Sequence, residues 1–304
     1  ERLDNIKTRN QKIQCINLNI RKGDVIPLIR NKDLTINCLP GFMGFEMLEK
    51  IIESKVSCVD ISFMPENIMD LSEMAMNNGC IVIPDAGVAP GLSNLISGNL
   101  VANNDIREIQ IMVGGLPKEK IPPWNYKAPF SPIDVIEEYT REARKRVNGK
   151  QEIKPALSEK FLLDVEGIGE LEAFLTDGLR TLMDDKGILS NVPNLAEYTI
   201  RYPGHCDLVK KMFKEGKFSE SNIDATCKEL FELWKLNEDE EEFTFMLIIA
   251  TKNDGKEISY TVFDEYTSGW SSMSRTTGLT ACALARIVLE DRIEGNGVIP
   301  PENI

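Results

Sequence analysis

The chain has 304 residues, of which 42% are hydrophobic and 27% are charged, so disordered, collagen-like and disulfide-stapled miniprotein classes are excluded and the length suggests two domains. Asp and Glu outnumber Lys and Arg by 48 to 35, giving a formal charge of −13 that opposes binding to the phosphates of nucleic acids. The sequence has no run of about 18 uncharged apolar residues, so we expect no membrane span.

The first third of the chain alternates short, β-branched apolar runs with helical patterns. Strands are predicted at 13–20, 34–39, 56–63 and 80–84, and helices at 45–54 and 68–78. Strands that alternate with single helices predict a parallel, doubly wound sheet, whose ligands bind beyond the carboxyl ends of the strands. The segments at those ends, Asn37–Phe42, Asp60–Phe63 and Asp85–Val88, are therefore the first candidates for a binding site.

Beyond residue 92 the pattern changes to that of a mixed α+β second domain. Strands are expected at 106–113, 197–202, 243–251 and 257–263, and helices at 133–138, 208–213, 222–236 and 278–290. A Pro-rich loop after the first of these strands carries Trp124, Tyr126 and Phe130, and loops of this kind often carry function.

Several shorter segments have local interpretations. Residues 1–7 have the pattern of a helix, and the last helix should bury a stripe through Leu279, Cys282 and Ile287. The basic cluster Arg141–Arg146 is interpreted as a solvated helix end, and the acidic run 238–242 as a loop.

The cysteines and the single histidine bear on compartment and metal binding. The seven cysteines are odd in number, form no C-x-x-C pair and lie mostly in apolar stretches, which is typical of a reducing cytoplasm. His205 is the only histidine, so a histidine-rich zinc site is not expected. We therefore expect a cytoplasmic protein without a resident metal.

In many dinucleotide-binding domains, a G-x-G-x-x-G turn between a strand and a helix binds the pyrophosphate. The sequence has no such turn between a predicted strand and helix. Gly167-Ile168-Gly169 lacks the third glycine and is interpreted as a plain turn. Gly41-Phe42-Met43-Gly44 does follow a predicted strand and open a helix, and it indicates either a tight turn or a close approach of backbone to ligand.

Six short blocks occur in an order that resembles a known family. They are Pro84–Gly91, Gly114–Pro117, Glu172–Phe174, Thr199–His205, Met273–Thr277 and Gly297–Glu302. Together they resemble the saccharopine dehydrogenase-like family, and within it they are most similar to the lysine 6-dehydrogenase branch. The saccharopine-forming branch has Asp before Pro-Gly and Cys before Gly-Gly-Leu-Pro, where this chain has Ala89 and Val113.

The resemblance implies an NAD(P)-dependent dehydrogenase of α/β fold. A Rossmann-like doubly wound sheet would occupy residues 1–91 and 268–304, with an α+β catalytic and dimerisation domain inserted at 92–267, in a homodimer or higher homo-oligomer. Family members begin with a strand, a Gly-rich turn, a helix and a second strand, so we expect roughly 30 to 50 further residues before residue 1. NAD and NADP stay open, because the discriminating residue would end that second strand.

The expected cofactor contacts are residues at or just beyond the carboxyl ends of the predicted strands. They are Cys38, Leu39, Pro40, Asp60, Ile61, Ser62, Val88, Ala89 and Pro90.

Oxidation of a primary amine to an imine needs a base, a carboxylate clamp and a dry pocket. Arg201 is the candidate clamp, because a guanidinium binds a carboxylate bidentately; a surface ion pair is the alternative. Asp177 would bind the ammonium group or take its proton, or else cap a helix. His205 would relay that proton, or else be a structural hydrogen-bonding residue. Tyr126 is a further catalytic candidate.

The remaining candidates for substrate contact are Lys127, Thr199 and Phe42. Three functions stay open for this protein, each involving a small-molecule ligand such as an amino acid or a nucleotide. The first is oxidation of the ε-amine of lysine with NAD or NADP. The second is an opine-type reductase that joins an amine to an oxo acid, as in saccharopine or carboxynorspermidine formation. The third is a noncatalytic nucleotide-sensing module or subunit.

Overall fold

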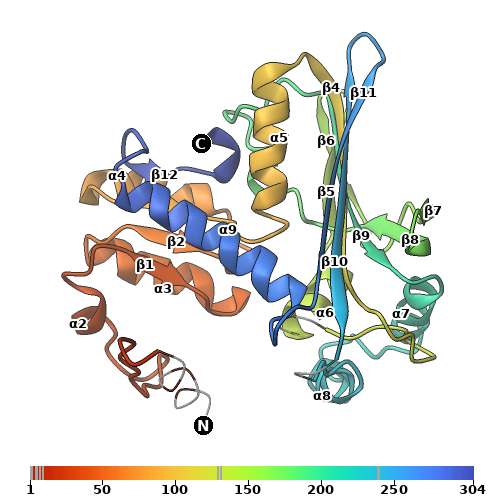
Figure 1. The fold of residues 1–304 in the computed structure, drawn as a ribbon, viewed down its shortest axis with the longest axis horizontal. Helices are drawn as coiled ribbons and strands as arrows, with labels where there is room; N and C mark the ends of the chain where they lie inside the picture. The colour runs from red at the N-terminus through yellow and green to blue at the C-terminus, as the bar shows by residue number, and fades with distance from the viewer. Residues whose placement is uncertain are drawn as a thin grey trace.

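The computed structural model describes residues 3, 6, 8, 10–128, 130, 132–237 and 240–304. Its strands form two sheets: a small sheet in the order β1-β2-β3-β12, and a large sheet in the order β11-β10-β4-β9-β5-β6, to which β7 and β8 are attached. Figure 1 shows the small sheet among its helices on one side, and the long strands of the large sheet standing beside it. In the described part of the chain, no helix is both long and apolar enough to cross a membrane.

The small sheet has the parallel, doubly wound topology that the apolar periodicity predicts. β1 (Thr35–Asn37), β2 (Cys58–Asp60) and β3 (Ile81–Ile83) are joined by α3 (Gly41–Glu53), η1 (Ile68–Leu71) and α4 (Ser72–Asn78). Leu48, Ile52 and Ala75 are buried between these helices and the sheet. At the far end of the chain, β12 (Gly297–Val298) pairs with β3 in parallel, and η3 (Pro301–Asn303) follows it.

The large sheet is built around one long strand. β4 (Ile106–Pro117) pairs with β10 (Glu242–Lys252) on one side and β9 (Asn194–Arg201) on the other. The remaining strands are β5 (Ala143–Val147), β6 (Lys150–Lys154), β7 (Phe161–Val165), β8 (Gly169–Leu175) and β11 (Glu257–Glu265). Beyond the sheets lie α2 (Ile26–Ile29), α5 (Leu92–Asn103), α6 (Pro132–Thr140), η2 (Arg180–Met183), α7 (His205–Lys214) and α8 (Ile223–Leu233). Separate hydrophobic clusters fill the two faces of this sheet.

Helix α9 (Ser272–Leu289) joins the two sheets. At its start, the backbone N–H and hydroxyl of Ser272 donate to the buried carboxylate of Glu242, the first residue of β10. Farther along, Ala281 and Leu284 pack in one apolar cluster with Val59 of β2. The helix therefore fixes the small sheet beside the large one, and Figure 1 shows it crossing from one to the other.

Two sequence-based expectations are wrong in the small-sheet region. The predicted strand 13–20 has no regular structure, and Ile13 and Ile16 are 42% and 48% exposed, because no described strand lies beside them. The last helix begins at Ser272 rather than Gly278, because the Ser271 side chain caps it by accepting from the N–H of Ser274. Its predicted stripe faces outward, and Leu279 is 65% exposed.

The basic cluster Arg141–Arg146 is not a solvated helix end. Its second half forms β5, and Arg146 is buried, donating through Nη1 to the carbonyl oxygens of Leu189 at 2.6 Å and Val192 at 3.2 Å. Buried carbonyl acceptors hold this guanidinium in the interior. In the acidic run, residues 238 and 239 lie outside the described residues, as does most of the helix expected at 1–7.

Candidate active site

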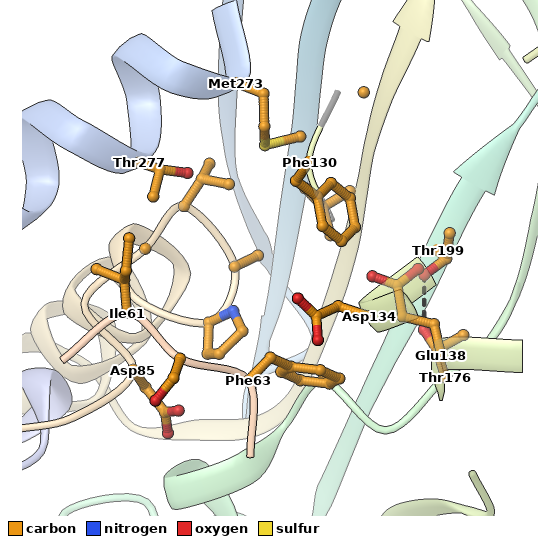
Figure 2. A pocket seen from close by; sticks show the side chains of 18 of the residues that line it. Ile61, Phe63, Asp85, Phe130, Asp134, Glu138, Thr176, Thr199, Met273 and Thr277 are labelled. Carbon is orange, nitrogen blue, oxygen red and sulfur yellow. Dashed lines mark hydrogen bonds between the residues drawn. The ribbon is translucent and has the colours of Figure 1, made fainter. Parts of the chain in front are cut away.

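A cavity of about 320 Å³ lies where the small sheet faces the large one. The small sheet contributes the loops that follow β1, β2 and β3, and the large sheet contributes the last third of β4, the end of β9 and the loop after β8. Helix α6 and the first turns of α9 complete the wall. Figure 2 shows Ile61 and Asp85 on one side of this cavity and Glu138, Thr176 and Thr199 on the other.

The small-sheet side is a mostly apolar wall whose loops contain closely packed glycines. A Cβ on Gly41 would lie 2.2 Å from the carbonyl oxygen of Phe63, and one on Gly91, whose φ is 137°, would lie 2.0 Å from that of Gly87. The first approach holds the loop after β1 against the loop after β2, and the second folds the loop after β3 back on itself. The wall fits a planar ring such as nicotinamide, so the residues present suit one half of a dinucleotide.

Most of the expected cofactor contacts lie on this wall. The cavity is lined by Cys38, Leu39, Pro40, Ile61, Ser62, Val88, Ala89 and Pro90. Asp60 lies behind it, fully buried, and accepts from the side-chain amide of Asn37 at 2.7 Å and the hydroxyl of Ser62 at 2.7 Å. Burial raises the pKa of Asp60 to about 7, although the Ser62 bond opposes the shift. Asp60 therefore holds the ends of β1 and β2 together.

Arg201 lies on the opposite wall, and each of its three guanidinium nitrogens donates a hydrogen bond. Its Nε donates to the hydroxyl of Tyr139 at 3.0 Å, and its Nη2 donates to the hydroxyl of Tyr126 at 3.4 Å and to Glu138 at 3.3 Å. Its Nη1 donates to the carbonyl oxygen of Ile200 at 2.9 Å. Burial raises the pKa of Glu138 to about 7, although Arg201 lowers it.

Asp177 also lines the cavity, and a guanidinium holds both of its carboxylate oxygens. Arg144 donates through Nε at 2.8 Å and through Nη2 at 2.9 Å, and its backbone N–H donates at 3.1 Å. This is a fork-to-fork ion pair, which fixes the carboxylate in one orientation. Asp177 does not cap a helix in the structure.

His205 and Tyr126 lie behind the cavity wall, outside its lining. The imidazole is 1% exposed, with Nε2 at 3.0 Å from the Tyr139 hydroxyl and Nδ1 at 3.3 Å from the Trp124 carbonyl oxygen. Tyr126 and Trp234 pack around the ring. Burial, with the nearby Arg201, lowers the pKa of His205 to about 3, so the ring is neutral near pH 7.

Two expected substrate contacts lie elsewhere. Lys127 donates to the carbonyl oxygen of Lys235 at 3.0 Å and lines a separate hollow with Glu240. Phe42 is 47% exposed, with the guanidinium of Arg21 at 5.1 Å from its ring centre. Thr199 does line the cavity.

The structure adds carboxyl groups that the sequence analysis did not single out. Asp134 and Glu138 come from α6, one turn apart, and Glu197 comes from β9, two residues before Thr199. The sequence did contain a signal for these positions, because residues four apart in a helix share a face, and so do residues two apart in a strand. Among the described residues that line the cavity, Asp85, Asp134, Glu138, Asp177 and Glu197 face one basic side chain, Arg201.

Glu197 has a hydrogen-bonded environment of its own. Its Oε2 accepts from the hydroxyl of Thr176 at 2.7 Å and from the backbone N–H of Gly178 at 3.0 Å. Burial raises its pKa to about 8, against the lowering effect of the Thr176 bond. In the described part of the chain, no three His, Cys, Asp or Glu side chains are grouped so that they could hold a metal ion.

Comparison with known proteins places this architecture in a family. The family model for the saccharopine dehydrogenase NADP binding domain matches residues 1–83, and that for the saccharopine dehydrogenase C-terminal domain matches residues 87–304. Alpha-aminoadipic semialdehyde synthase of Rattus norvegicus is 24% identical over 73% of this chain, and that of Mus musculus is 21% identical over 90%. This chain spans 26% and 38% of the length of those relatives.

A solved structure has the same fold. Saccharopine dehydrogenase (L-Glu forming) of Saccharomyces cerevisiae superposes with a TM-score of 0.76 at 17% identity, over 99% of this chain and 86% of that one. The expected fold class, a Rossmann-like parallel sheet with an added α+β domain, is therefore confirmed. The chain belongs to the saccharopine dehydrogenase family and carries the NAD(P)-binding domain of that family.

Proposed function

We propose that the protein is an NAD(P)-dependent oxidoreductase that acts on the side-chain amine of an amino acid, with the ε-amine of L-lysine as substrate. The observation that carries this proposal is the cavity itself, in which a mostly apolar wall faces a wall rich in carboxyl groups. The first wall suits the nicotinamide ring, and the second suits a cationic nitrogen. A bound dinucleotide would accept the hydride that the substrate carbon beside that nitrogen loses.

The carboxyl-rich wall explains how the chain would select its substrate. In a partly dehydrated cavity, an ammonium group is attracted to carboxylates several times more strongly than in water. Lysine brings two ammonium groups and one carboxylate, whereas an opine such as saccharopine brings more than one carboxylate. Ala89 and Val113, which replace the Asp and Cys of the saccharopine-forming branch, both line the cavity. A substrate with a single carboxylate is therefore less disfavoured beside these carboxyl groups than an opine, which supports lysine.

Arg201 is the group proposed to bind the substrate carboxylate. Its Nη2 now contacts Glu138, whose pKa of about 7 lets it take up a proton and release the guanidinium near neutral pH. A substrate carboxylate would then replace that of Glu138 on the same nitrogen. The hydroxyl of Tyr139 would keep the guanidinium in place during the exchange.

The second candidate is an opine-type reaction, formation or cleavage of a secondary amine between an amino acid and an oxo acid. The similarity to saccharopine dehydrogenase and to alpha-aminoadipic semialdehyde synthase favours it. The two candidates share the hydride transfer at a C–N bond. They differ in whether an oxo acid is a co-substrate.

Assays of nicotinamide absorbance in both directions separate the candidates. We expect lysine to reduce NAD⁺ or NADP⁺ without an oxo acid, and saccharopine to be a poorer substrate. Oxidation of NADH or NADPH that depends on both an amine and an oxo acid would favour the opine reaction instead. Absence of hydride transfer in every arm, with dinucleotide binding retained, would refute both and leave the noncatalytic sensor.

A further inference from the structure

Three side chains on the carboxyl-rich wall form a continuous hydrogen-bonded chain. Thr176 donates its hydroxyl proton to Glu197 at 2.7 Å. The hydroxyl oxygens of Thr176 and Thr199, both labelled in Figure 2, are 2.8 Å apart. A hydroxyl group has a single proton to donate. With Thr176 donating to an ionised Glu197, Thr199 must donate to Thr176. The free lone pairs of Thr199 are then left to accept an N–H.

The sheet register holds this chain in place. β8 and β9 are antiparallel with Phe174 opposite Thr199, so Thr176, just beyond β8, lies opposite Glu197. The alternation of β9 puts Glu197 and Thr199 on one face, which is the face toward the cavity. A Cβ on Gly178 would lie 2.5 Å from the Glu197 carboxyl carbon, so only glycine lets that backbone N–H reach the carboxylate.

The charges around Glu197 favour a group that titrates near neutral pH. The carboxyl group is buried, which disfavours its ionised form, and Glu138 of α6 and Asp177 of the adjoining loop add like charge. Each of those two neighbours is already paired, Glu138 with Arg201 at 3.3 Å and Asp177 with Arg144 at 2.8 Å. A base whose pKa lies near the working pH transfers protons most efficiently.

The other candidate bases are less suited to the task. His205 lies behind the wall and stays neutral because its pKa is about 3. Both oxygens of Asp177 accept from Arg144. Glu197 combines a cavity-facing position with a hydrogen-bonded path to a second cavity-facing group, Thr199.

We propose that Glu197 accepts the proton that the substrate ammonium group loses before oxidation, with Thr199 and Thr176 relaying it; this deepens, and rests on, the function proposed above. An N–H bond of the ammonium group breaks, and its proton passes to the oxygen of Thr199. The proton of Thr199 passes to Thr176, and that of Thr176 passes to Oε2 of Glu197. An ammonium and a carboxylate become a neutral amine and a neutral acid, with no electrons exchanged.

The decisive variant is Glu197→Gln, whose amide oxygen still accepts from Thr176 but cannot take a proton at neutral pH. We expect kcat for amine oxidation at pH 8 to fall about 10²- to 10⁴-fold. The deficit should shrink as pH approaches about 10.4, where the amine loses its proton to water. Thr199→Val removes the hydroxyl group proposed to contact the substrate, and its kcat deficit relative to the wild type should likewise shrink as pH rises. This variant tests the proton relay if Glu197→Gln does not fold.

Matched controls separate this role from a structural one. Glu170→Gln changes an exposed residue of β8, and Thr251→Val removes a buried hydroxyl at the far end of β10. Both should keep the wild-type pH profile. A Glu197→Gln deficit that stays the same at every pH would overturn the assignment, because a packing defect does not depend on the protonation of the substrate.

Infrared difference spectroscopy provides a readout independent of turnover. The carbonyl band of protonated carboxyl groups should lose the component that titrates near pH 8 in Glu197→Gln, while the components of Asp60, Glu138 and Glu302 near pH 7 remain. An unchanged band in the variant would overturn the assignment. Absence of hydride transfer by the wild type would instead overturn the proposed function, whereas an active wild type whose variant keeps its pH profile would overturn the role of Glu197 alone.

Discussion

The ion pair between Asp85 and Arg180 should be one of the main connections between the small sheet and the large-sheet region. Asp85 follows β3 and Arg180 lies in η2, and Nε of Arg180 donates to Oδ1 of Asp85 at 3.1 Å. The side chains are 0% and 3% exposed, respectively. Arg180 also donates to the carbonyl oxygen of Met64, just after β2. One guanidinium thus contacts two strand ends of the small sheet.

Replacing Arg180 with Met leaves the Asp85 carboxylate buried without its cation. Its remaining hydrogen-bond partner among the described residues is the hydroxyl of Thr181 at 3.3 Å. Breaking a buried pair by removing one partner costs about 3–5 kcal/mol. The double variant Arg180→Met/Asp85→Asn no longer contains the buried charge, so it should recover a large part of that loss. The expected coupling energy is about 2–3 kcal/mol.

Urea titration at pH 7 of the wild type, both single variants and the double variant measures this coupling. Arg286→Met is the matched control, because its pair with Glu290 is shorter, at 2.6 Å, but the Arg286 side chain is 78% exposed. That variant should change the free energy of unfolding by no more than about 0.5 kcal/mol. Additive effects of the two single variants, or a loss below about 1 kcal/mol for Arg180→Met, would refute the reasoning.

Four further variants test other parts of the structure. Arg201→Lys removes the guanidinium fork, so KM for lysine should rise about tenfold or more while KM for the dinucleotide changes little; equal changes would exclude the carboxylate role. Burial raises the pKa of Glu302 to about 7, above the value of about 4.3 in an unfolded chain, so its ionisation favours unfolding as pH rises through that interval. The wild type should therefore lose about 3 kcal/mol of unfolding free energy relative to Glu302→Gln between pH 4.5 and 7.5, and a constant difference in urea titrations would contradict this. His205→Gln should lower stability by about 1–3 kcal/mol yet leave the pH dependence of turnover unchanged from pH 5 to 9, and loss of a titrating limb would restore the relay role. Gly41→Ala sets a Cβ 2.2 Å from the carbonyl oxygen of Phe63 and should destabilise by about 1–3 kcal/mol in thermal melts, so an unchanged melting temperature would argue against the close approach.

Local periodicity was enough to predict the small sheet. The apolar runs at 34–39, 56–63 and 80–84 each contain a parallel strand, and the helical patterns between them form α3 and α4. Parallel strands end at the same edge, so their following loops were expected to meet, and they do line one cavity. The same reasoning failed at 13–20, where an apolar run has no described strand to pair with.

Helix faces and charged clusters were harder to interpret from the sequence. The outward face of α9 also carries large apolar side chains, Leu279 and Leu289, so the apolar pattern alone does not identify the buried face; the contact with β2 does. Arg146 is charged, yet it is buried, because its guanidinium donates to the carbonyl oxygens of Leu189 and Val192, which lie 43 and 46 residues away in the chain. Such outcomes depend on which distant groups come within reach, and no local pattern contains that information.

The candidate site shows the same division. The sequence by itself determined the parallel sheet, the binding edge and the presence of Arg201 on a strand, because these follow from the chemistry of neighbouring residues. Only the tertiary structure decided that Arg201 is engaged by Tyr139, that His205 lies behind the wall, and that Thr176 meets Glu197. Residues from separate elements come together only through strand register and helix packing, which are set by contacts between segments that lie far apart in the chain.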